Sequence, residues 1–484
     1  MNFKTLLLFP MAAAQFAAAE PLAKSPAIPM FQENRKQEWY AWMPSKGRAE
    51  PWPEQIRVRE DGTVHVLDIP VTGKPEEFGY FATRDDYRNY RLHFDYKWGE
   101  KKFEPRGKAP RNSGLLYHII GEDRLWPGCV EYQVQEGDTG DFHLLWRDTR
   151  PTMDAPVESA EQVKGRRFVF SPQGEWVRGT TSSVQRNPKM DHAKEWNRCV
   201  LEVRGTESRH FVNGTLNNAA SNLKDFEGKP LDSGRIAFQV EGAEIFYRNI
   251  SIAPITWPLE HEPFRVLVFS KTEKFRHDSI GTGAEALRKL GDSFGFEVAH
   301  TENADDFTEE KLRDFRVVVF LSTSGDVLNP AQQTAFEGFI RSGGGFVGIH
   351  SACDTEYDWP WFGELVGAYF SNHPAQQTAD LYLTDETSTS TSMLPRKWTR
   401  KDEWYNFRKN PDPAKVQVLL RVDESSYKGG RMGESHPISW QHEFDGGRSW
   451  FTALGHTKES FHEPLFLMHV LGGIQYAAGI PAAE

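Results

Sequence analysis

The sequence predicts a multidomain protein in which an antiparallel β-sandwich is followed by a doubly wound α/β domain. At 484 residues the chain is longer than a single hydrophobic core usually supports. Its first half alternates apolar and polar residues with a period of two, whereas its second half places continuous apolar strands between helical patterns. We therefore divide the chain into a signal peptide (1–19), a sandwich (30–255), a linker (256–263) and an α/β domain (264–480).

The first residues have the pattern of a secretory signal peptide. Lys4 precedes the apolar run LLLFPMAAAQFAAA, and small residues at Ala17 and Ala19 form a cleavage site before Glu20. This run is too short and too rich in alanine for a membrane anchor, and the sequence contains no second such stretch. We expect a periplasmic or secreted protein that has no membrane span after the signal is removed.

Composition argues against nucleic acid as a partner, and it does not decide whether two of the cysteines pair. The net charge of −11 and the lack of a Lys/Arg stripe argue against nucleic acid as a partner. Three cysteines do not make a disulfide scaffold. Cys129 and Cys199 either pair across neighbouring strands or are buried separately as small hydrophobes, and we favour separate burial.

Short, alternating, aromatic-rich segments define the sandwich. The strand at 112–120 reads NSGLLYHII and the strand at 129–136 reads CVEYQVQE. Asn213-Gly214 is a strong hairpin signal between two further strands. Many short strands without an amphipathic helix between them indicate two packed antiparallel sheets.

The segment APITWPLEHEPF, which contains three prolines, separates the two halves. After it, RVLVFS and RVVVFLST are continuous apolar strands, which is typical of buried parallel sheets. GAEALRKLGDSFG and NPAQQTAFEGFIRSG have helical patterns. Ligands of such domains bind at the carboxyl ends of the strands, and the strand GGGFVGIH ends there with His350.

The sandwich strands carry a polar row that a simple core does not need. Glu131, Gln133 and Gln135 alternate along one strand, and His143 follows shortly after them. Arg111 and Asn112 begin a neighbouring strand. A carboxylate, amides and an imidazole on one concave face are suited to sugar binding and proton transfer. The alternative is that an outward sheet face is simply polar.

Three ordered motifs, NSGLLYHI, PGCVEYQVQEGDTGD and GRIAFQVEGAEIFYRNISI, resemble the 3-keto-disaccharide hydrolase family, which has a concanavalin-like jelly-roll fold. The resemblance implies cleavage of glycosides already oxidised at C3, by elimination followed by hydration. It implies Glu131 or His143 as the catalytic base. Arg111, or a divalent metal held by Glu131 and His143, would polarise the ketone, while Asn112 and Gln133 bind substrate.

Five histidines of the second half lie in loops or at the ends of elements: His277, His350, His373, His436 and His456. Each alone is more typical of a surface or capping residue. Several histidines at the same carboxyl edge of a sheet are better explained by a functional site. Their spacing fits no compact zinc motif, so the sequence does not support a metal there.

The motifs FRHDSI, GGGFVGIHSACDTEYDWPWF, SNHP, KDEWYNF, SHPISW and GGRSWFTALGHT, in this order, resemble the ThuA-like family, named for trehalose utilisation. That resemblance implies a fold like class I glutamine amidotransferases, in which His350 takes the place of a nucleophilic thiol. Cys353 follows in the first turn of the next helix. We expect its thiol to point away from the tip of the turn that carries His350.

Around this turn we expect a cleft that performs proton transfer or sugar binding. His350 and Glu403 are the expected catalytic residues. The expected substrate-binding residues are His277, Asp354, His373, Tyr405, His436, Trp440 and His456. Trp404 is a further candidate wall of the cleft, whereas Trp359 and Trp361 are expected to be core residues.

The sequence thus predicts an exported carbohydrate-active enzyme. Its sandwich would cleave 3-keto-glucosides or 3-keto-disaccharides, and its α/β domain would act on or bind the keto-sugar product. Two alternatives remain: a carbohydrate-binding sandwich fused to an α/β enzyme of unknown reaction, or an amidase-like hydrolase that uses Cys353. The cofactor is unknown from sequence, apart from the divalent metal considered for the sandwich.

Overall fold

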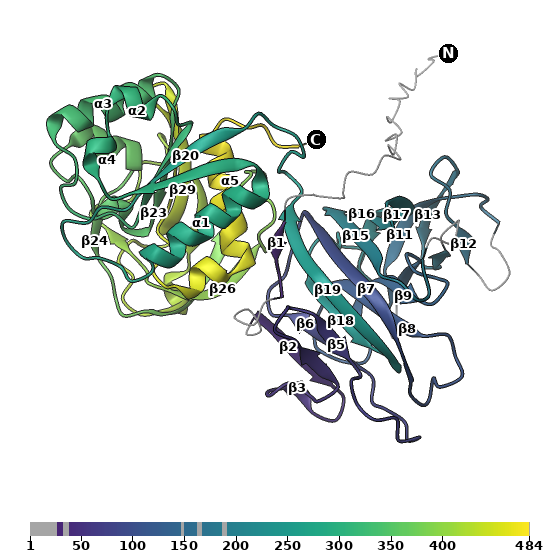
Figure 1. Cartoon of the computed structure of the whole chain (residues 1–484). Coiled ribbons are helices and arrows are strands. Elements are labelled where there is room, and N and C mark those ends of the chain that lie inside the picture. Colours follow the sequence, from purple (N-terminus) through teal and green to yellow (C-terminus); the bar gives the residue numbers. More distant parts are fainter. Residues whose placement is uncertain (1–26, 32–37, 147–149, 162–166, 186–190, 484) are drawn as a thin grey trace, which may run out of the picture.

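The computed structural model describes residues 27–31, 38–146, 150–161, 167–185 and 191–483. It contains an N-terminal sandwich of two large sheets and a C-terminal domain built on a mixed sheet (Figure 1). The expected signal peptide at 1–19 lies outside the described residues. Within the described part of the chain, every helix is too short or too polar to cross a bilayer.

The first sheet of the sandwich has ten strands, and β7 and β19 form its long centre. In sheet order it contains β13 (Glu175–Thr180), β11 (Thr152–Val157), β17 (Thr215–Lys224), β16 (Glu207–Val212), β15 (Asn197–Arg204), β7 (Tyr90–Lys102), β19 (Ala243–Pro254), β5 (Val64–Val66) and β4 (Ile56–Val58), with β1 (Ile28–Pro29) also on β19. The predicted hairpin at Asn213-Gly214 is confirmed, since this turn joins β16 to β17.

The second sheet has nine strands and carries the polar row predicted from sequence. In sheet order it contains β12 (Phe168–Val169), β14 (Val184–Gln185), β10 (Phe142–Leu145), β9 (Gly128–Gln135), β8 (Asn112–Ile120), β18 (Arg235–Val240), β6 (Gly79–Thr83), β2 (Trp39–Met43) and β3 (Gly47–Ala49). Alternate residues of β9, namely Val130, Tyr132 and Val134, belong to the main core between the sheets. The intervening residues of β9 therefore point to the opposite, outer face.

The C-terminal domain has a nine-stranded mixed sheet. In sheet order it contains β21 (Phe296–Thr301), β20 (Phe264–Phe269), β22 (Val317–Leu321), β23 (Gly345–Ile349), β30 (Gly447–Thr452), β29 (Pro437–Phe444), β28 (Gln417–Val422), β25 (Gln377–Leu383) and β26 (Lys397–Asp402). The strands from β21 to β30 pair in parallel, whereas those from β30 to β26 pair antiparallel.

Helices accompany the parallel half of this sheet. They are α1 (Ile280–Phe294), α2 (Glu309–Leu312), α3 (Pro330–Arg341), α4 (Pro360–Val366) and α5 (Pro464–Ala477), and a separate two-stranded ribbon joins β24 (Phe370–Asn372) to β27 (Asn406–Phe407). The prediction of a doubly wound domain therefore describes only the parallel half. The antiparallel extension needs no crossover helix, because antiparallel neighbours can be joined by short connections.

The segment expected to be a linker is packed rather than loose. Trp257 is 2% exposed, and its ring centroid lies 5.4 Å from that of Phe294 on α1. The carbonyl of Thr256 accepts hydrogen bonds from the Gln475 side chain and from the backbone N–H of Ala483. The three prolines mark the change from one fold to the other. The residues between them are nevertheless packed against the C-terminal domain and do not form a free linker.

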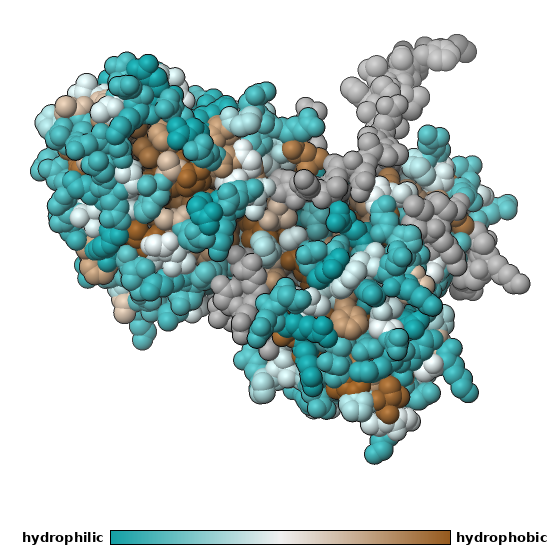
Figure 2. Space-filling model, in the orientation of Figure 1, coloured by the Kyte–Doolittle hydropathy of each residue, from teal (hydrophilic) through white to brown (hydrophobic). Residues whose placement is uncertain are grey.

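Charged groups join the two domains a short distance from this segment. Arg396 of the C-terminal domain pairs with Asp232 of the sandwich at 2.8 Å, and Arg88 of the sandwich pairs with Glu386 at 2.8 Å. The Asn89 amide also donates to a carbonyl of the C-terminal domain. On the face drawn in Figure 2, both domains are mainly hydrophilic, with scattered apolar patches.

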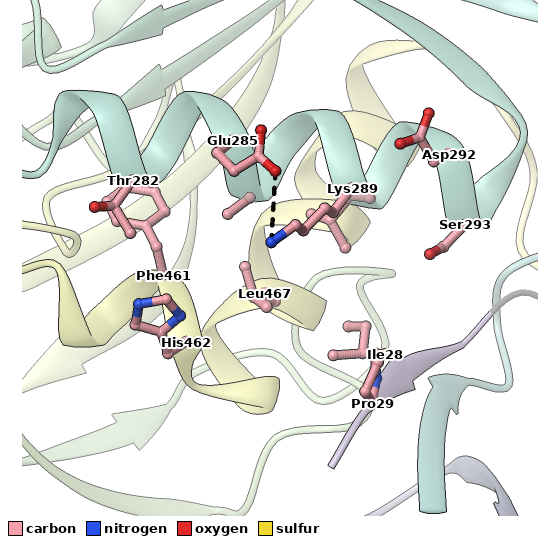
Figure 3. Close-up of a pocket in the computed structure, with 12 residues that line it drawn as sticks. Ile28, Pro29, Thr282, Glu285, Lys289, Asp292, Ser293, Phe461, His462 and Leu467 are labelled. Carbon is pink, nitrogen blue, oxygen red and sulfur yellow. Dashed lines mark ion pairs between the residues drawn. The ribbon is translucent and has the colours of Figure 1, made fainter. Parts of the chain in front are cut away.

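A groove lies where β1 meets α1 (Figure 3). Ile28 and Pro29 of β1 face Leu467 across it, and Lys289 on α1 forms an ion pair with Glu285 at 3.5 Å along its upper wall. The first strand of the sandwich therefore borders a helix of the other domain.

The three cysteines are buried and unpaired. We expect no thiol of the native protein to react quickly with a bulky disulfide reagent, because burial raises the pKa of each thiol. In denaturant without reductant, all three should react. Detection of fewer than three thiols by absorbance under those conditions would reveal a disulfide that contradicts the structure.

Candidate functional site

The turn after β23 presents His350 in a constrained conformation. Its backbone φ is 55°, in the left-handed region that non-glycine residues rarely adopt. The ring is fully buried, and its Nδ1 donates a hydrogen bond to the carbonyl of Ala453 at 2.8 Å. Because Nδ1 carries the proton, the lone pair of Nε2 is directed to the opposite side of the ring.

Three further side chains converge on that nitrogen. Nε2 of His277 and Nδ1 of His456 each lie 3.1 Å from Nε2 of His350, and a carboxylate oxygen of Glu403 lies 3.6 Å away. One ligand atom from each of these four residues lies within 4.8 Å of every other. We call this group the His/Glu cluster. The expected convergence of His277, Glu403 and His456 on His350 is what the structure shows.

The cluster is assembled from both halves of the sheet. His277 follows β20 and His456 follows β30, so both lie at the carboxyl edge of parallel strands. Glu403 comes directly after β26, in the antiparallel extension. The buried carboxylate of Asp402 accepts hydrogen bonds from the backbone N–H groups of Glu403 and His456, at 2.9 and 3.1 Å. Asp402 thereby fixes two cluster loops together.

The charges in the cluster are strongly coupled. Burial alone would raise the pKa of Glu403, but hydrogen bonds with His350 and His456 outweigh it and hold that pKa well below its usual range. Burial, reinforced by the neighbouring His350 and His456, lowers the pKa of His277 to about 2. Burial opposes ionisation of His456 too, yet Glu403 raises its pKa above the usual value. The cluster therefore combines a charged carboxylate with a neutral His277 imidazole, and it favours a proton on His456 that a metal ion would have to displace.

This donor set fits a divalent transition metal. Imidazole nitrogens and a carboxylate oxygen are the usual ligands of Zn²⁺ and its neighbours. Two imidazole lone pairs 3.1 Å apart repel each other unless a proton or a cation lies between them. The hydrogen bond from His350 to Ala453 is the outer-shell contact that metal-binding histidines generally have. The absence of a compact motif did not rule out a metal, because the ligands come from distant loops.

Three further residues border the cluster, one buried and two exposed. The Tyr405 hydroxyl donates to Nε2 of His350 at 2.8 Å, and burial raises the pKa of that phenol well above its normal value. His373, which is 40% exposed, lies 3.0 Å from the second carboxylate oxygen of Glu403. Phe275, 65% exposed, places its ring centroid 4.8 Å from that of His277. These three residues border the approach to the cluster.

Several expected cleft residues instead support the fold. The indole nitrogens of Trp440 and Trp404 donate to the carbonyls of Val366 and Gln377, and both rings are fully buried. His436 is also buried, where it bonds the backbone carbonyl of Tyr405 at 2.8 Å. Large rings in the extension of the sheet fill its core, and they therefore do not form walls for a sugar.

Asp354 and Cys353 do not join the cluster either. The Asp354 carboxylate accepts a hydrogen bond from the Tyr357 hydroxyl at 2.6 Å. The Cys353 thiol is fully buried and directed to the His350 carbonyl, and burial raises its pKa well above normal. A protonated, inaccessible thiol is a poor nucleophile, so the amidase alternative loses its catalytic group. Trp359 is a core residue, as expected, but Trp361 is only partly buried and packs against that core.

A second polar site lies on the outer face of the sandwich sheet that contains β9. Glu131 stands directly opposite His143 on β10, and Gln135 stands opposite Asn112 on β8. Directly opposed residues of antiparallel strands point to the same face, so these residues share one surface with Gln133. The polar row predicted from sequence is therefore one continuous face, which we call the Glu131 face.

Glycine makes room for the central carboxyl. A Cβ at Gly114 would come within 2.5 Å of both the Glu131 and the Gln239 side-chain oxygens. Burial, with the neighbouring charge of Glu241, raises the pKa of Glu131 to about 8, against smaller opposing effects of Gln239 and Arg106. At neutral pH the carboxyl is mostly protonated, and it becomes a base just above neutrality.

The positively charged side chain beside the Glu131 face is Arg106, whereas Arg111 was expected there. Arg111 bonds Glu136 at 3.0 Å and the Gly99 carbonyl at 3.1 Å. Arg106 instead pairs with Glu241 at 3.1 Å and bonds the Gln135 amide. Arg106 follows a turn that no sequence pattern linked to β9, so its approach to this face could not be read from spacing.

His143 is a weak base in this environment. Burial and the nearby Arg167 lower its pKa to about 4, and its Nδ1 bonds the Ser183 hydroxyl at 2.9 Å. Among the described residues, no group of three metal-ligating side chains includes Glu131 or His143. The metal considered for the sandwich therefore has no complete ligand set here. Of the two side chains, Glu131 is therefore the stronger base.

Aromatic side chains continue the Glu131 face across the sheet. Tyr80 on β6 is paired with Gln239 on β18, and its ring stacks on Trp42 of β2 with centroids 5.3 Å apart. Asp123 accepts hydrogen bonds from the hydroxyls of Tyr80 and Tyr40, at 2.9 and 2.6 Å. Tyr80 and Trp42 are buried, so this pair packs in a small hydrophobic cluster that adjoins the polar row.

A third group of titratable residues is an ion-pair network. His65 lies 2.9 Å from Glu244 and 3.2 Å from Asp68. The Lys101 ammonium lies within 3.4 Å of both carboxylates, and Arg59 bonds His65. Because these cations already neutralise the carboxylates, the network needs no metal ion.

Family models match both halves of the chain. The 3-keto-alpha-glucoside-1,2-lyase-like domain family matches residues 26–253, and the ThuA family, described as trehalose utilisation, matches residues 265–477. No curated protein matches the sequence.

Solved structures resemble each half separately. Putative ThuA-like proteins from Bacteroides uniformis and Parabacteroides merdae are 23% and 19% identical; they cover 45% and 46% of this chain and 92% of their own, each with a TM-score of 0.39. The carbohydrate-binding module CBM66 from Bacillus subtilis is 8% identical and covers 47% of this chain and 99% of its own, with a TM-score of 0.27.

The cluster predicts tight binding of a divalent metal by the purified protein after chelator treatment. Replacing His350 with Ala should weaken Zn²⁺ binding by more than about 100-fold, since even outer-shell changes cost about 10–100-fold at such sites. Isothermal titration calorimetry measures the change. His300→Ala is the matched control, because His300 bonds Ser270 outside the cluster. Equal affinities of the wild type and His350→Ala would contradict the metal assignment.

Proposed function

Because the chain joins a 3-keto-alpha-glucoside-1,2-lyase-like domain to a ThuA domain, we propose that it is a carbohydrate-active enzyme that cleaves 3-keto-glucosides or 3-keto-disaccharides. The sandwich performs elimination and hydration on the Glu131 face. The ThuA domain binds or transforms the keto-sugar product at the His/Glu cluster. The observation that carries the proposal is Glu131, a buried carboxyl whose pKa of about 8 suits a base working near neutral pH.

The proposed reaction needs one base and hydrogen-bond donors rather than two opposed carboxylates. A ketone at C3 acidifies the hydrogen at C2, and the Glu131 carboxylate removes that proton. The electron pair left at C2 forms a double bond to C1 as the C1–O bond breaks and the leaving oxygen takes up a proton. Water then adds across this bond, with its oxygen going to C1 and a proton to C2. The amides of Gln133 and Asn112 lie on the same face, where they can donate to the oxygen at C3.

The His/Glu cluster supports a separate step on a keto sugar, by isomerisation or hydration. A divalent metal held by His277, His350, Glu403 and His456 would supply a Lewis acid for a carbonyl oxygen. The Tyr405 phenol stays protonated and can hydrogen-bond a substrate oxygen. His373 is the most open imidazole at the cluster, so it can exchange protons with solvent.

A second candidate function is carbohydrate binding without cleavage by the sandwich. The row of amide and carboxyl groups on one face favours it, since such groups can hydrogen-bond sugar hydroxyls without any reaction. The two candidates differ in what Glu131 does. If the sandwich only binds sugar, the Glu131→Gln variant should bind sugar with nearly the affinity of the wild type. The wild type itself should then show no cleavage.

We also propose export to the periplasm or beyond, on the strength of the basic residue, apolar run and small-residue site before Glu20. Expression of the full chain in a bacterial host should then yield a mature protein that begins near Glu20. Intact-mass spectrometry of the periplasmic and cytoplasmic fractions measures this. An uncleaved protein confined to the cytoplasm would contradict export.

Glu131→Gln should abolish most cleavage of a 3-keto-glucoside, with a loss on the order of 10²–10⁴ in rate. In the wild type, kcat/KM should rise with pH toward about 8, because only the ionised carboxylate accepts a proton. The change is measured by following release of an aglycone chromophore over pH 5–9. Asp138→Asn is a control beside this face, because Asp138 lies in the turn after β9 and accepts a hydrogen bond from the Gln135 amide. It should retain activity.

The pH dependence of thermal stability tests the raised pKa of Glu131 independently of activity. A carboxyl with a raised folded-state pKa stabilises the fold below its unfolded pKa, and this contribution is lost as pH rises toward about 8. Glu131→Gln removes the cost of ionising a buried group. Its melting temperature should therefore fall less than that of the wild type between pH 6 and pH 9. Parallel melting curves would show that Glu131 titrates normally.

A further inference from the structure

A polar cleft of about 710 Å³ lies where the two domains meet. The sandwich contributes Arg84 and Asp85, and the C-terminal domain contributes Arg400, Lys401 and Glu463 among others. Its lining residues belong neither to the His/Glu cluster nor to the Glu131 face. The volume falls within the range of about 300–1,000 Å³ that is usual for small-molecule sites. We call it the interdomain cleft.

Arg400 is a buried charged group of this cleft whose N–H groups are only partly used by hydrogen bonds. Its side chain is 2% exposed, and its Nη2 bonds Ser460 at 2.7 Å and pairs with Asp402 at 3.1 Å. Among the described residues, its Nε and Nη1 have no hydrogen-bond partner, and Nη1 lies 3.4 Å from the Glu463 carboxylate. Buried N–H groups without an acceptor cost free energy, so a ligand oxygen in the cleft would be stabilising.

Carboxyl groups face this guanidinium. Burial, with the neighbouring Asp86, raises the pKa of Asp85 to about 6. Burial also raises the pKa of Glu463 to about 7, an effect that Asp85 strengthens and Arg400 opposes. Such carboxyls can both donate and accept hydrogen bonds near neutral pH. The ring of Trp398 adds an apolar surface beneath Arg400, whose guanidinium carbon lies 4.6 Å from the ring centroid.

The mixture of charges selects the ligand class. An anion would meet Asp85 and Glu463, and a cation would meet Arg400 and Lys401. A neutral polyol satisfies both kinds of group, because each hydroxyl donates to a carboxylate and accepts from a guanidinium or an ammonium. We propose that the interdomain cleft binds a neutral mono- or disaccharide. The choice of a sugar among polyols rests on the proposed function, whereas the site itself rests on the cleft.

Lys401 provides a readout at the site, since its amine lines the cleft and is exposed. The full-length protein is treated with an amine-acetylating reagent with and without maltose, which has no C3 ketone to be processed. Peptide mass spectrometry then measures the modification of each lysine. Maltose should slow acetylation of Lys401 several-fold in a saturable manner. Lys289, on α1 outside the cleft and 68% exposed, is the internal control and should not change.

Asp85→Ala should raise the maltose concentration needed for protection by about 10-fold or more, the usual effect of losing a hydrogen bond to a charged group. Asp314→Ala, an exposed carboxylate outside the cleft, is the matched control and should change nothing. Circular dichroism checks the fold, and Asp85→Asn replaces Asp85→Ala if the latter does not fold.

Three outcomes would overturn the proposal: no protection at saturating maltose, equal protection of Lys401 and Lys289, or protection by sodium phosphate as strong as by maltose. The last would make the cleft an anion site. Failure of the proposed function is a separate result. It would appear as no cleavage of a 3-keto-glucoside, with the protection of Lys401 by maltose unaffected.

Discussion

The arrangement of the C-terminal site depends on one buried carboxylate, that of Asp402. It accepts hydrogen bonds from the backbone N–H groups of Glu403, Gly455 and His456, and it pairs with Arg400. Two loops that are more than fifty residues apart in sequence are thereby held against each other. Removing one partner of such a buried ion pair typically costs about 3–5 kcal/mol. This carboxylate holds the backbones of two of the four cluster residues, Glu403 and His456, next to each other.

The same ion pair connects the cluster to the boundary between the domains. Arg400 contacts Asp402 on one side and lines the interdomain cleft on the other. The interface is reinforced by the ion pairs of Arg88 and Arg396 and by the packed segment around Trp257. A sugar held between the domains would therefore lie against a residue that supports the cluster. Fusion of the two domains creates this cleft, which neither domain could form alone.

The two sites place their titratable groups in opposite electrostatic environments. On the Glu131 face, burial and Glu241 favour the neutral carboxyl, which yields a base near neutral pH. In the His/Glu cluster, the imidazoles favour the charged form of Glu403, which makes it a ligand rather than a base. One carboxylate thus suits proton transfer and the other suits cation binding, although both are largely buried.

The sequence by itself determined features that depend on local patterns. The alternation of polar and apolar residues along β9 predicted that Glu131 and Gln133 lie on one face, because successive side chains of a strand point to opposite sides. The apolar strand that ends in His350 placed that imidazole at the strand end. The order of motifs predicted the two families whose models match the two halves. Asn213-Gly214 likewise specified its hairpin, since a tight turn is a local property.

Only the tertiary structure decided which distant groups meet. That these four side chains form a candidate metal site was not predictable, because they come from separate loops and have no characteristic spacing. The same holds for Arg106, which takes the place expected of Arg111, and for Trp440 and His436, whose burial depends on the antiparallel extension of the sheet. Spacing encodes contacts within one element. Contacts between elements depend on strand order and loop packing, which the whole chain determines together.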